Sequence, residues 1–256
     1  DGAVFVLDWS DAGECHEHTG VHRTSGRIFK VRNAQKPATT KPTDLTNWSL
    51  AELVNIHAGR NDWYTRQARL ELARRAMTSD VTSCYSGLKR LLEKSESSRT
   101  TKVQALLTLH VLGGADQKLL RELSKASHES LRSWSIRLLT DAWPIDDAMG
   151  TSPANASDRS RVRQQSQELM PHLLAMANDD ASALVRLSLA SIMQRLPIDF
   201  RSVLAKALVS REEDKADHNL PLMIWYGLIP VTNRNPSELV DVAKACKLPK
   251  TLELMS

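Results

Sequence analysis

Cysteine and histidine side chains gather in one short stretch near the start of the chain. Cys15, His16, His18 and His22 fall within eight positions, and cysteine and histidine are side chains that transition metals prefer. Metal ligands usually come from separate elements that converge on the ion, so these four can meet only if the loop folds back on itself. The stretch is therefore either a candidate metal site or a polar loop in which Cys15 forms one half of a disulfide.

The other residues that could carry chemistry show no catalytic or cofactor-binding pattern. The sequence has no C-x-x-C pair, no C-x-x-C-H haem motif, no Gly-rich phosphate loop, no G-x-S-x-G and no H-E-x-x-H. His57, His110 and His172 lie near apolar positions and are expected to be hydrogen-bonded structural histidines. Cys84 and Cys246 are expected to be small packing groups. We therefore expect no cofactor and no complete catalytic constellation in this chain.

Positive charge is concentrated in the middle of the chain. Residues 60–142 contain fifteen Lys and Arg against nine Asp and Glu, an excess of +6, whereas residues 143–256 contain thirteen against fourteen. Such a basic half marks a nucleic-acid-binding surface or reflects solvated helix faces. A single groove lined by its arginines favours nucleic-acid binding, and pairing of those arginines with carboxylates disfavours it. The arginines that would line such a groove are Arg66, Arg69, Arg74, Arg132 and Arg137. The candidate interaction surface comprises Arg66, Arg69, Arg132, Arg137 and Arg186.

The pattern of apolar residues divides the chain into three parts. Residues 1–32 hold two strand-like runs, at 3–7 and 27–31, and predict a β-hairpin. Residues 33–47 are rich in Pro and Thr and predict a linker. Residues 48–256 show helical periodicity, interrupted at about 144–160 by a loop rich in Ser, Asp and Ala. No apolar run approaches the roughly 18 residues of a membrane-spanning helix, so we expect no membrane span.

Cap residues and apolar stripes locate the individual helices. Ser49 with Glu52 predicts a capping box, Asn61 with Asp62 predicts the next helix start, and Gly59 between them is expected in the left-handed conformation. Stripes at helical spacing predict the buried faces. These stripes are Trp63, Leu70, Ala73 and Met77; Val103, Leu106, Leu107 and Val111; Leu131, Trp134, Leu138 and Ala142; and Val185, Leu189, Ile192, Met193 and Leu196.

Two further features concern the apolar residues of these helices. Residues 220–229 are apolar on almost every side and predict a helix that is buried all round. Trp63, Trp134 and Trp225 fall at comparable places within their helices, so we expect them in the core rather than on an exposed stacking platform.

A weak internal repeat runs through the helical part. Arg66, Lys102, Arg132 and Arg186 each precede a small residue within a similar segment, at spacings of 36, 30 and 54 residues. HEAT-type repeats run about 40 residues per helix pair. We therefore predict an all-α fold: a right-handed α-α superhelix, a HEAT- or armadillo-like solenoid, with a short N-terminal β-hairpin. A single helical bundle is the alternative.

Several strings of the sequence resemble one known family. Residues 1–9 (DGAVFVLDW), 13–16 (GECH) and 24–31 (TSGRIFKV) resemble the last propeller blade of large secreted proteins of planctomycetes and verrucomicrobia that are described as membrane-bound dehydrogenases. Residues 61–69 (NDWYTRQAR) resemble the start of the helical-repeat region of this family. Residues 184–191 (LVRLSLAS) and 217–226 (DHNLPLMIWY) resemble its later repeats.

The resemblance implies a context for the chain. In that family a β-propeller precedes HEAT-like repeats, and a cytochrome domain with a C-x-x-C-H motif usually follows. Residues 1–32 would then be a remnant of the propeller's last blade, the protein would be periplasmic or secreted, and its partners would be its own propeller and cytochrome domains. Only two strands of a four-stranded blade and no haem motif are present, so the dehydrogenase activity does not transfer to these residues. The chain begins with Asp1-Gly2 rather than Met, and we expect an upstream part.

These observations lead to one functional expectation and two alternatives. We expect a non-catalytic helical-repeat scaffold or interaction module that links a propeller to a downstream electron-transfer domain, and a protein partner is a further candidate. The first alternative is a HEAT-like nucleic-acid-binding module that uses residues 60–142. It is disfavoured because the excess charge is spread over several helices with acidic residues between. The second is a metal enzyme that uses the loop from Cys15 to His22.

Overall fold

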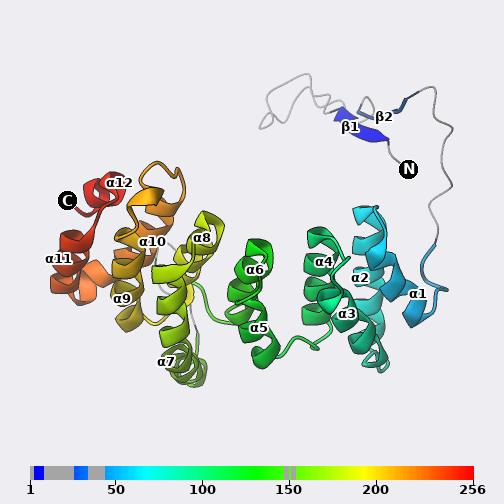
Figure 1. Cartoon of the computed structure of the whole chain (residues 1–256), viewed down its shortest axis with the longest axis horizontal. Coiled ribbons are helices and arrows are strands. Elements are labelled where there is room, and N and C mark those ends of the chain that lie inside the picture. Colours follow the sequence, from blue (N-terminus) through cyan, green and yellow to red (C-terminus); the bar gives the residue numbers. More distant parts are fainter. Residues whose placement is uncertain (1–2, 9–25, 34–43, 147–149, 151–153) are drawn as a thin grey trace, which may run out of the picture. The chain divides into compact units, whose positions relative to one another are not determined.

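Two compact units make up the chain, Asp1–Trp48 and Ser49–Ser256. The computed structural model describes residues 3–8, 26–33, 44–146, 150 and 154–256. Within these residues it contains two β-strands, twelve α-helices and three short 3-10 helices (Figure 1). A mostly helical fold with a short N-terminal β-hairpin is therefore confirmed. The boundary at Trp48 falls beside the predicted end of the linker.

The N-terminal unit contains an antiparallel hairpin of β1 (Val4–Asp8) and β2 (Arg27–Val31). Val4 lies opposite Val31 and Asp8 lies opposite Arg27, so the predicted hairpin is present with its first strand shifted by one residue. A lone two-stranded hairpin is marginally stable in water. Apolar side chains on both strands are exposed, among them Leu7 and Ile28. The hairpin alone does not bury them, and its origin as a propeller blade stays a prediction.

The second unit consists of short helices joined by tight turns. The α-helices are α1 (Leu50–Asn55), α2 (Asp62–Ala76), α3 (Ser83–Glu93), α4 (Arg99–Val111), α5 (Gln117–Leu123), α6 (Glu129–Leu139), α7 (Ala156–Asp179), α8 (Ala183–Ile192), α9 (Ile198–Val209), α10 (Leu220–Arg234), α11 (Pro236–Ala245) and α12 (Pro249–Met255). The 3-10 helices are η1 (Ile56–Ala58), η2 (Met193–Arg195) and η3 (Glu212–Asp214). In the described part of the chain, every helix is too short or too polar to cross a bilayer.

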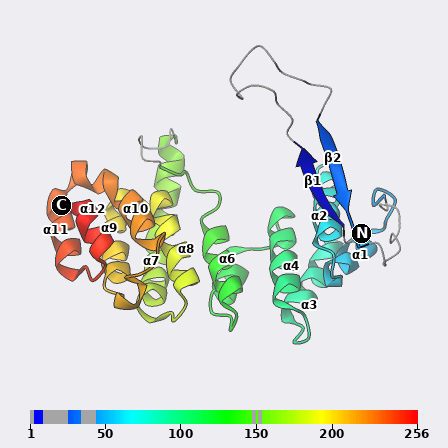
Figure 2. The same ribbon diagram turned by 90° about the horizontal axis from the view of Figure 1, so that it is seen from above.

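The helices of this unit pack in a regular order. In one row, α4, α6, α8, α10 and α12 each contact the next member, and α7, α9 and α11 do the same in a second row. Helices that follow one another also pack together, as α3 does with α4, α5 with α6 and α9 with α10. Figures 1 and 2 show α1 to α12 following one another through the unit. The main contacts therefore join helices that lie close together in the sequence.

The predicted helix starts are confirmed at the caps. The backbone N–H of Ser49 donates to Glu52 Oε2 at 2.7 Å and the backbone N–H of Glu52 donates to Ser49 Oγ at 3.3 Å, which completes a capping box. Asn61 Oδ1 accepts from the backbone N–H of Trp63 at 3.1 Å and caps α2. Gly59 differs from expectation: its φ of −75° and ψ of 168° are extended, because η1 replaces the left-handed helix ending.

The buried stripe of α8 is also confirmed. Val185, Leu189, Ile192, Met193 and Leu196 are all buried. The helix α8 contacts α6 and α10, and η2, which contains Met193, contacts α10 as well. Gly227 of α10 lies so close to Met193 that a Cβ on this glycine would be 2.6 Å from Met193 Cβ. Glycine is therefore required at this crossing.

The predicted buried stripe of α2 is wrong. Trp63 is 50% exposed, and Leu70 and Met77 are exposed as well. The face that packs instead carries Thr65, Ala68, Glu71 and Leu72. A small residue such as Ala68 allows α1 and α4 to approach α2 closely. Close packing on this face therefore outweighs the burial that the larger apolar side chains on the other face would gain.

Other predicted positions of apolar residues are corrected in part. Tyr226 is 40% exposed, so α10 is not buried all round, and Trp134 and Trp225 are half-buried. Val111 at the end of α4 is exposed, and Ala142 lies beyond the end of α6. The predicted loop at 144–160 is shorter, because Asn155 Oδ1 accepts from the backbone N–H of Asp158 at 2.8 Å and starts α7 at Ala156.

The cap of α2 yields a stability prediction. Asn61→Ala removes the side-chain acceptor for the N–H of Trp63 and should lower the free energy of unfolding by about 1 kcal/mol. Asp62→Ala is the matched control, since Asp62 is the first helical residue and interacts mainly with the helix dipole. Urea unfolding followed by circular dichroism measures both. A larger loss for Asp62→Ala than for Asn61→Ala would show that Asn61 is not the cap.

Candidate functional site

The predicted metal-binding stretch lies outside the described residues. Cys15, His16, His18 and His22 all fall between residues 9 and 25, which the structure does not describe. Among the residues that it does describe, no group of three or more His, Cys, Asp or Glu side chains is placed to hold a metal ion. The metal hypothesis for Cys15 to His22 therefore stays a prediction.

Two hydroxyl–imidazole contacts resemble the start of a nucleophile–base pair. Thr108 Oγ1 lies 2.8 Å from His57 Nε2, and Ser124 Oγ lies 2.7 Å from His172 Nε2. Both hydroxyl side chains are buried, and Ser124 Oγ also lies 2.8 Å from the carbonyl oxygen of Arg121. Burial lowers the pKa of both imidazoles, which favours their neutral forms. Because both hydroxyls are buried, we interpret these contacts as internal hydrogen bonds.

Arg69 of the basic half belongs to the same internal network as His57. Its Nε donates to Thr108 Oγ1 at 3.0 Å, and its Nη2 donates to the side chain of Gln104. Burial lowers the pKa of Arg69, with a further contribution from the charge of Arg66. Arg69 therefore joins α2 to α4, while Arg66 is exposed on α2.

Arg74 is paired with a carboxylate on its own helix. Its Nε donates to Glu71 Oε2 at 2.8 Å, and Arg75 Nε donates to Glu71 Oε1 at 2.7 Å. The hydrogen bond from Arg74, together with that from Arg75 and both positive charges, lowers the pKa of Glu71 to about 2 although burial opposes the shift. One nearly buried carboxylate thus offsets part of the charge of two arginines.

The remaining predicted interaction residues are used differently from one another. Arg132 holds Asp180 with two hydrogen bonds, at 2.7 and 2.8 Å, and Arg137 stacks over the ring of Trp134 at 4.5 Å. Arg186 donates to both carboxylate oxygens of Asp214 at 2.5 Å and is only 2% exposed. The expectation that Arg186 lies on an interaction surface is therefore corrected: its guanidinium is a core group.

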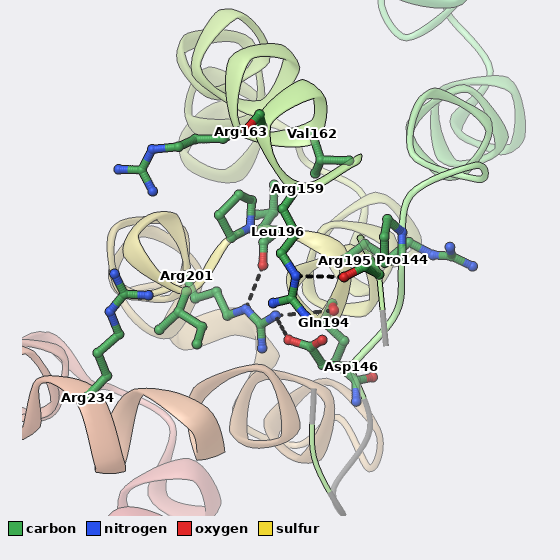
Figure 3. A pocket seen from close by; sticks show the side chains of 14 residues that line it. Pro144, Asp146, Arg159, Val162, Arg163, Gln194, Arg195, Leu196, Arg201 and Arg234 are labelled. Carbon is green, nitrogen blue, oxygen red and sulfur yellow. Dashed lines mark hydrogen bonds and ion pairs between the residues drawn. The ribbon is translucent and has the colours of Figure 1, made fainter. Parts of the chain in front are cut away.

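A different set of arginines surrounds a cavity of about 270 Å³ in the C-terminal half of the helical unit (Figure 3). It lies between the start of α7, the segment around η2, the start of α9 and the end of α10. We call this cavity the arginine pocket. Its walls include Pro144, Val162, Leu196, Pro197 and Ile198, and its arginines are Arg159, Arg163, Arg195, Arg201 and Arg234.

The arginines of this pocket have distinct surroundings. Arg201 is buried, and its Nε donates to the carbonyl oxygen of Leu196 at 2.8 Å while Nη2 contacts Asp146. Arg195 donates to the carbonyl oxygen of Trp143 at 2.5 Å, directed away from the other guanidinium groups (Figure 3). Arg201 and Arg195 are therefore fixed by the fold.

Arg163 and Arg234 share one carboxylate. Arg163 Nη1 lies 2.5 Å from Asp199 Oδ2, and Arg234 Nη2 lies 3.1 Å from Asp199 Oδ1. Both arginine side chains are more than half exposed, at 57% and 58%. They form the solvent-facing edge of the pocket, where the positive charge of two arginines meets one negative charge.

The sequence carried little sign of the arginine pocket. Arg159 and Arg163 are spaced four apart, which places them on one face of α7. Arg201 and Arg234 come from other helices and adjoin the pocket only after the chain has folded.

No protein-family model matches the chain, and no curated protein matches its sequence.

The pair of Arg186 and Asp214 gives a test of its structural role. Arg186→Met leaves the carboxylate of Asp214 buried without its partner and should lower the free energy of unfolding by about 3–5 kcal/mol. Adding Asp214→Asn removes that stranded charge and should restore a large part of the loss. The control is Arg161→Met, which breaks the exposed pair with Asp158 and should cost less than about 1 kcal/mol. Equal effects of the two arginine variants in urea unfolding would contradict a core role for Arg186.

Proposed function

We propose that the chain is a non-catalytic, HEAT-like helical-repeat scaffold, a right-handed α-solenoid that holds other domains or a partner protein in place. The observation that carries this proposal is the order of helix contacts, in which each helix packs on the next member of its row and on its neighbour in sequence. In a solenoid, each repeat contacts mainly its neighbours, which leaves a long surface for binding. This pattern of contacts between neighbouring helices supports a solenoid over a bundle around one shared core.

The exposed face of α2 also supports an interaction role. Trp63, Leu70 and Met77 are seven residues apart, so they lie on one helix face, and all three are exposed. Exposed apolar side chains that gather on one face are typical of surfaces that another domain or protein covers. This stripe is in the first part of the helical unit, next in sequence to the N-terminal unit.

The resemblance to the planctomycete and verrucomicrobial dehydrogenase-like proteins supplies the context of the proposal. In that context the helical unit is a spacer between a propeller and a cytochrome domain of one secreted or periplasmic polypeptide. Any oxidation would belong to those two domains. The helical unit would set their separation and offer a docking surface.

Nucleic-acid binding is supported less well by the arginine contacts. Arg74 pairs with Glu71, Arg132 pairs with Asp180, and Arg69 is held by neutral side chains. A phosphate-binding groove needs such guanidinium groups to be concentrated and directed at the ligand. Here they mainly connect elements of the same chain.

The context can be tested on the gene itself. Sequencing on both sides of the region that encodes this chain should reveal propeller strands upstream and a C-x-x-C-H motif downstream. The physical reason is that β1 and β2 need further strands to cover their apolar side chains. Flanking regions that encode neither feature would contradict the spacer role.

A titration with DNA separates the scaffold from the nucleic-acid-binding alternative. We expect a Kd no tighter than roughly 10⁻⁶ M at physiological salt, without sequence preference, because Arg69, Arg74 and Arg132 of the basic half are engaged within the chain. Fluorescence anisotropy with a labelled duplex of about 20 base pairs measures this affinity. Sub-micromolar binding with a steep dependence on salt concentration would overturn the scaffold proposal.

A further inference from the structure

The arginine pocket gathers positively charged side chains in the half of the chain that has no net positive charge. Residues 143–256 carry thirteen Lys and Arg against fourteen Asp and Glu, a net −1. Five of these cations line the arginine pocket, and the carboxylates of Asp199 and Asp146 pair with three of them: Asp199 with Arg163 and Arg234, and Asp146 with Arg201. The composition of this half therefore does not explain the cluster.

The edge of the pocket has the geometry to hold an anionic group. Arg163 and Arg234 both reach the carboxylate of Asp199, so their guanidinium groups lie within the span of one small anion. A guanidinium has five N–H donors in a planar fork that matches the oxygens of a carboxylate or phosphate. Arg163 Nη1 and Arg234 Nη2 lie at opposite oxygens of Asp199, and the exposure of both side chains lets them turn a fork toward a ligand.

The interior of the pocket adds a fixed guanidinium, paired with Asp146, and apolar walls. Arg201 is held by the carbonyl oxygen of Leu196 and by Asp146, so its guanidinium cannot leave. Val162, Pro197 and Ile198 line the same space. The cavity of about 270 Å³ lies just below the usual range of ligand pockets, about 300–1,000 Å³, so it suits a compact molecule.

We propose that the arginine pocket binds a small organic anion, in which a carboxylate or phosphate monoester is attached to a compact apolar body. Arg163 and Arg234 contact the anionic group, and the apolar walls contact the body. Asp199 is the internal counterion that the ligand competes with for the two guanidinium groups. This site is independent of the scaffold function, so failure of either proposal leaves the other standing.

Isothermal titration of the full chain with phenyl phosphate tests the site. We expect saturable binding, at least tenfold tighter than that of benzyl alcohol, which has the apolar body without the charge. Inorganic phosphate, which has the charge without the body, should also bind at least tenfold more weakly. Equal affinity for phenyl phosphate and either comparison compound would overturn the proposal, as would no binding of phenyl phosphate at all.

Variants assign the binding to the named residues. The double variant Arg163→Gln/Arg234→Gln should weaken phenyl phosphate binding at least tenfold. Arg161→Gln is the matched control because Arg161 lies on the same helix, is 49% exposed and pairs with Asp158 outside the pocket. It should change the affinity by less than twofold. Unchanged binding in the double variant, or an equal loss in the control, would overturn the assignment.

A variant that should gain affinity for phenyl phosphate tests the site even if the double variant fails to fold. Asp199→Asn removes the competing carboxylate while Arg163 and Arg234 remain, so it should bind phenyl phosphate at least threefold more tightly. A destabilised protein would not bind more tightly, which separates this result from a folding defect. Weaker or unchanged binding in folded Asp199→Asn would contradict the role of Asp199 as counterion.

Discussion

Guanidinium–carboxylate pairs that are buried or half-buried place the strictest demand on how the helices of this chain meet. Arg132 joins α6 to Asp180 after α7, Arg186 joins α8 to Asp214 in η3, and Arg201 joins α9 to Asp146 before α7. A buried charge that loses its partner costs several kcal/mol. Each pair therefore tolerates little change in the distance or register of the elements that it connects. The apolar side chains of α8 must pack in the arrangement of helices that these pairs allow.

Internal contacts of this kind explain why the net charge of the sequence is a poor guide to the charge on the surface. The basic half directs Arg69, Arg74 and Arg132 at groups of the same chain. The half with net −1 instead places five of its eight arginines around one cavity. Net charge counts residues, whereas binding depends on which charges remain available after the internal contacts are made. This difference favours a scaffold over a phosphate-binding groove in residues 60–142.

The apolar surface follows a similar principle. α2 buries Ala68 and Leu72 and exposes Trp63 and Met77, although the larger side chains would gain more from burial. A close helix contact is limited by backbone approach, which small residues permit. The result is an exposed apolar stripe on α2, which is one of the observations behind the proposed interaction role.

The sequence by itself determined the elements that depend on a few adjacent residues. The hairpin, the capping box at Ser49 and the buried stripe of α8 were predictable because caps and strong periodicity act within one or two helical turns. Only the tertiary structure decided which face of α2 is buried, that Arg186 is a core residue and that Arg163 and Arg234 meet at Asp199. Those outcomes depend on groups far apart in sequence, whose proximity follows from how the helices pack.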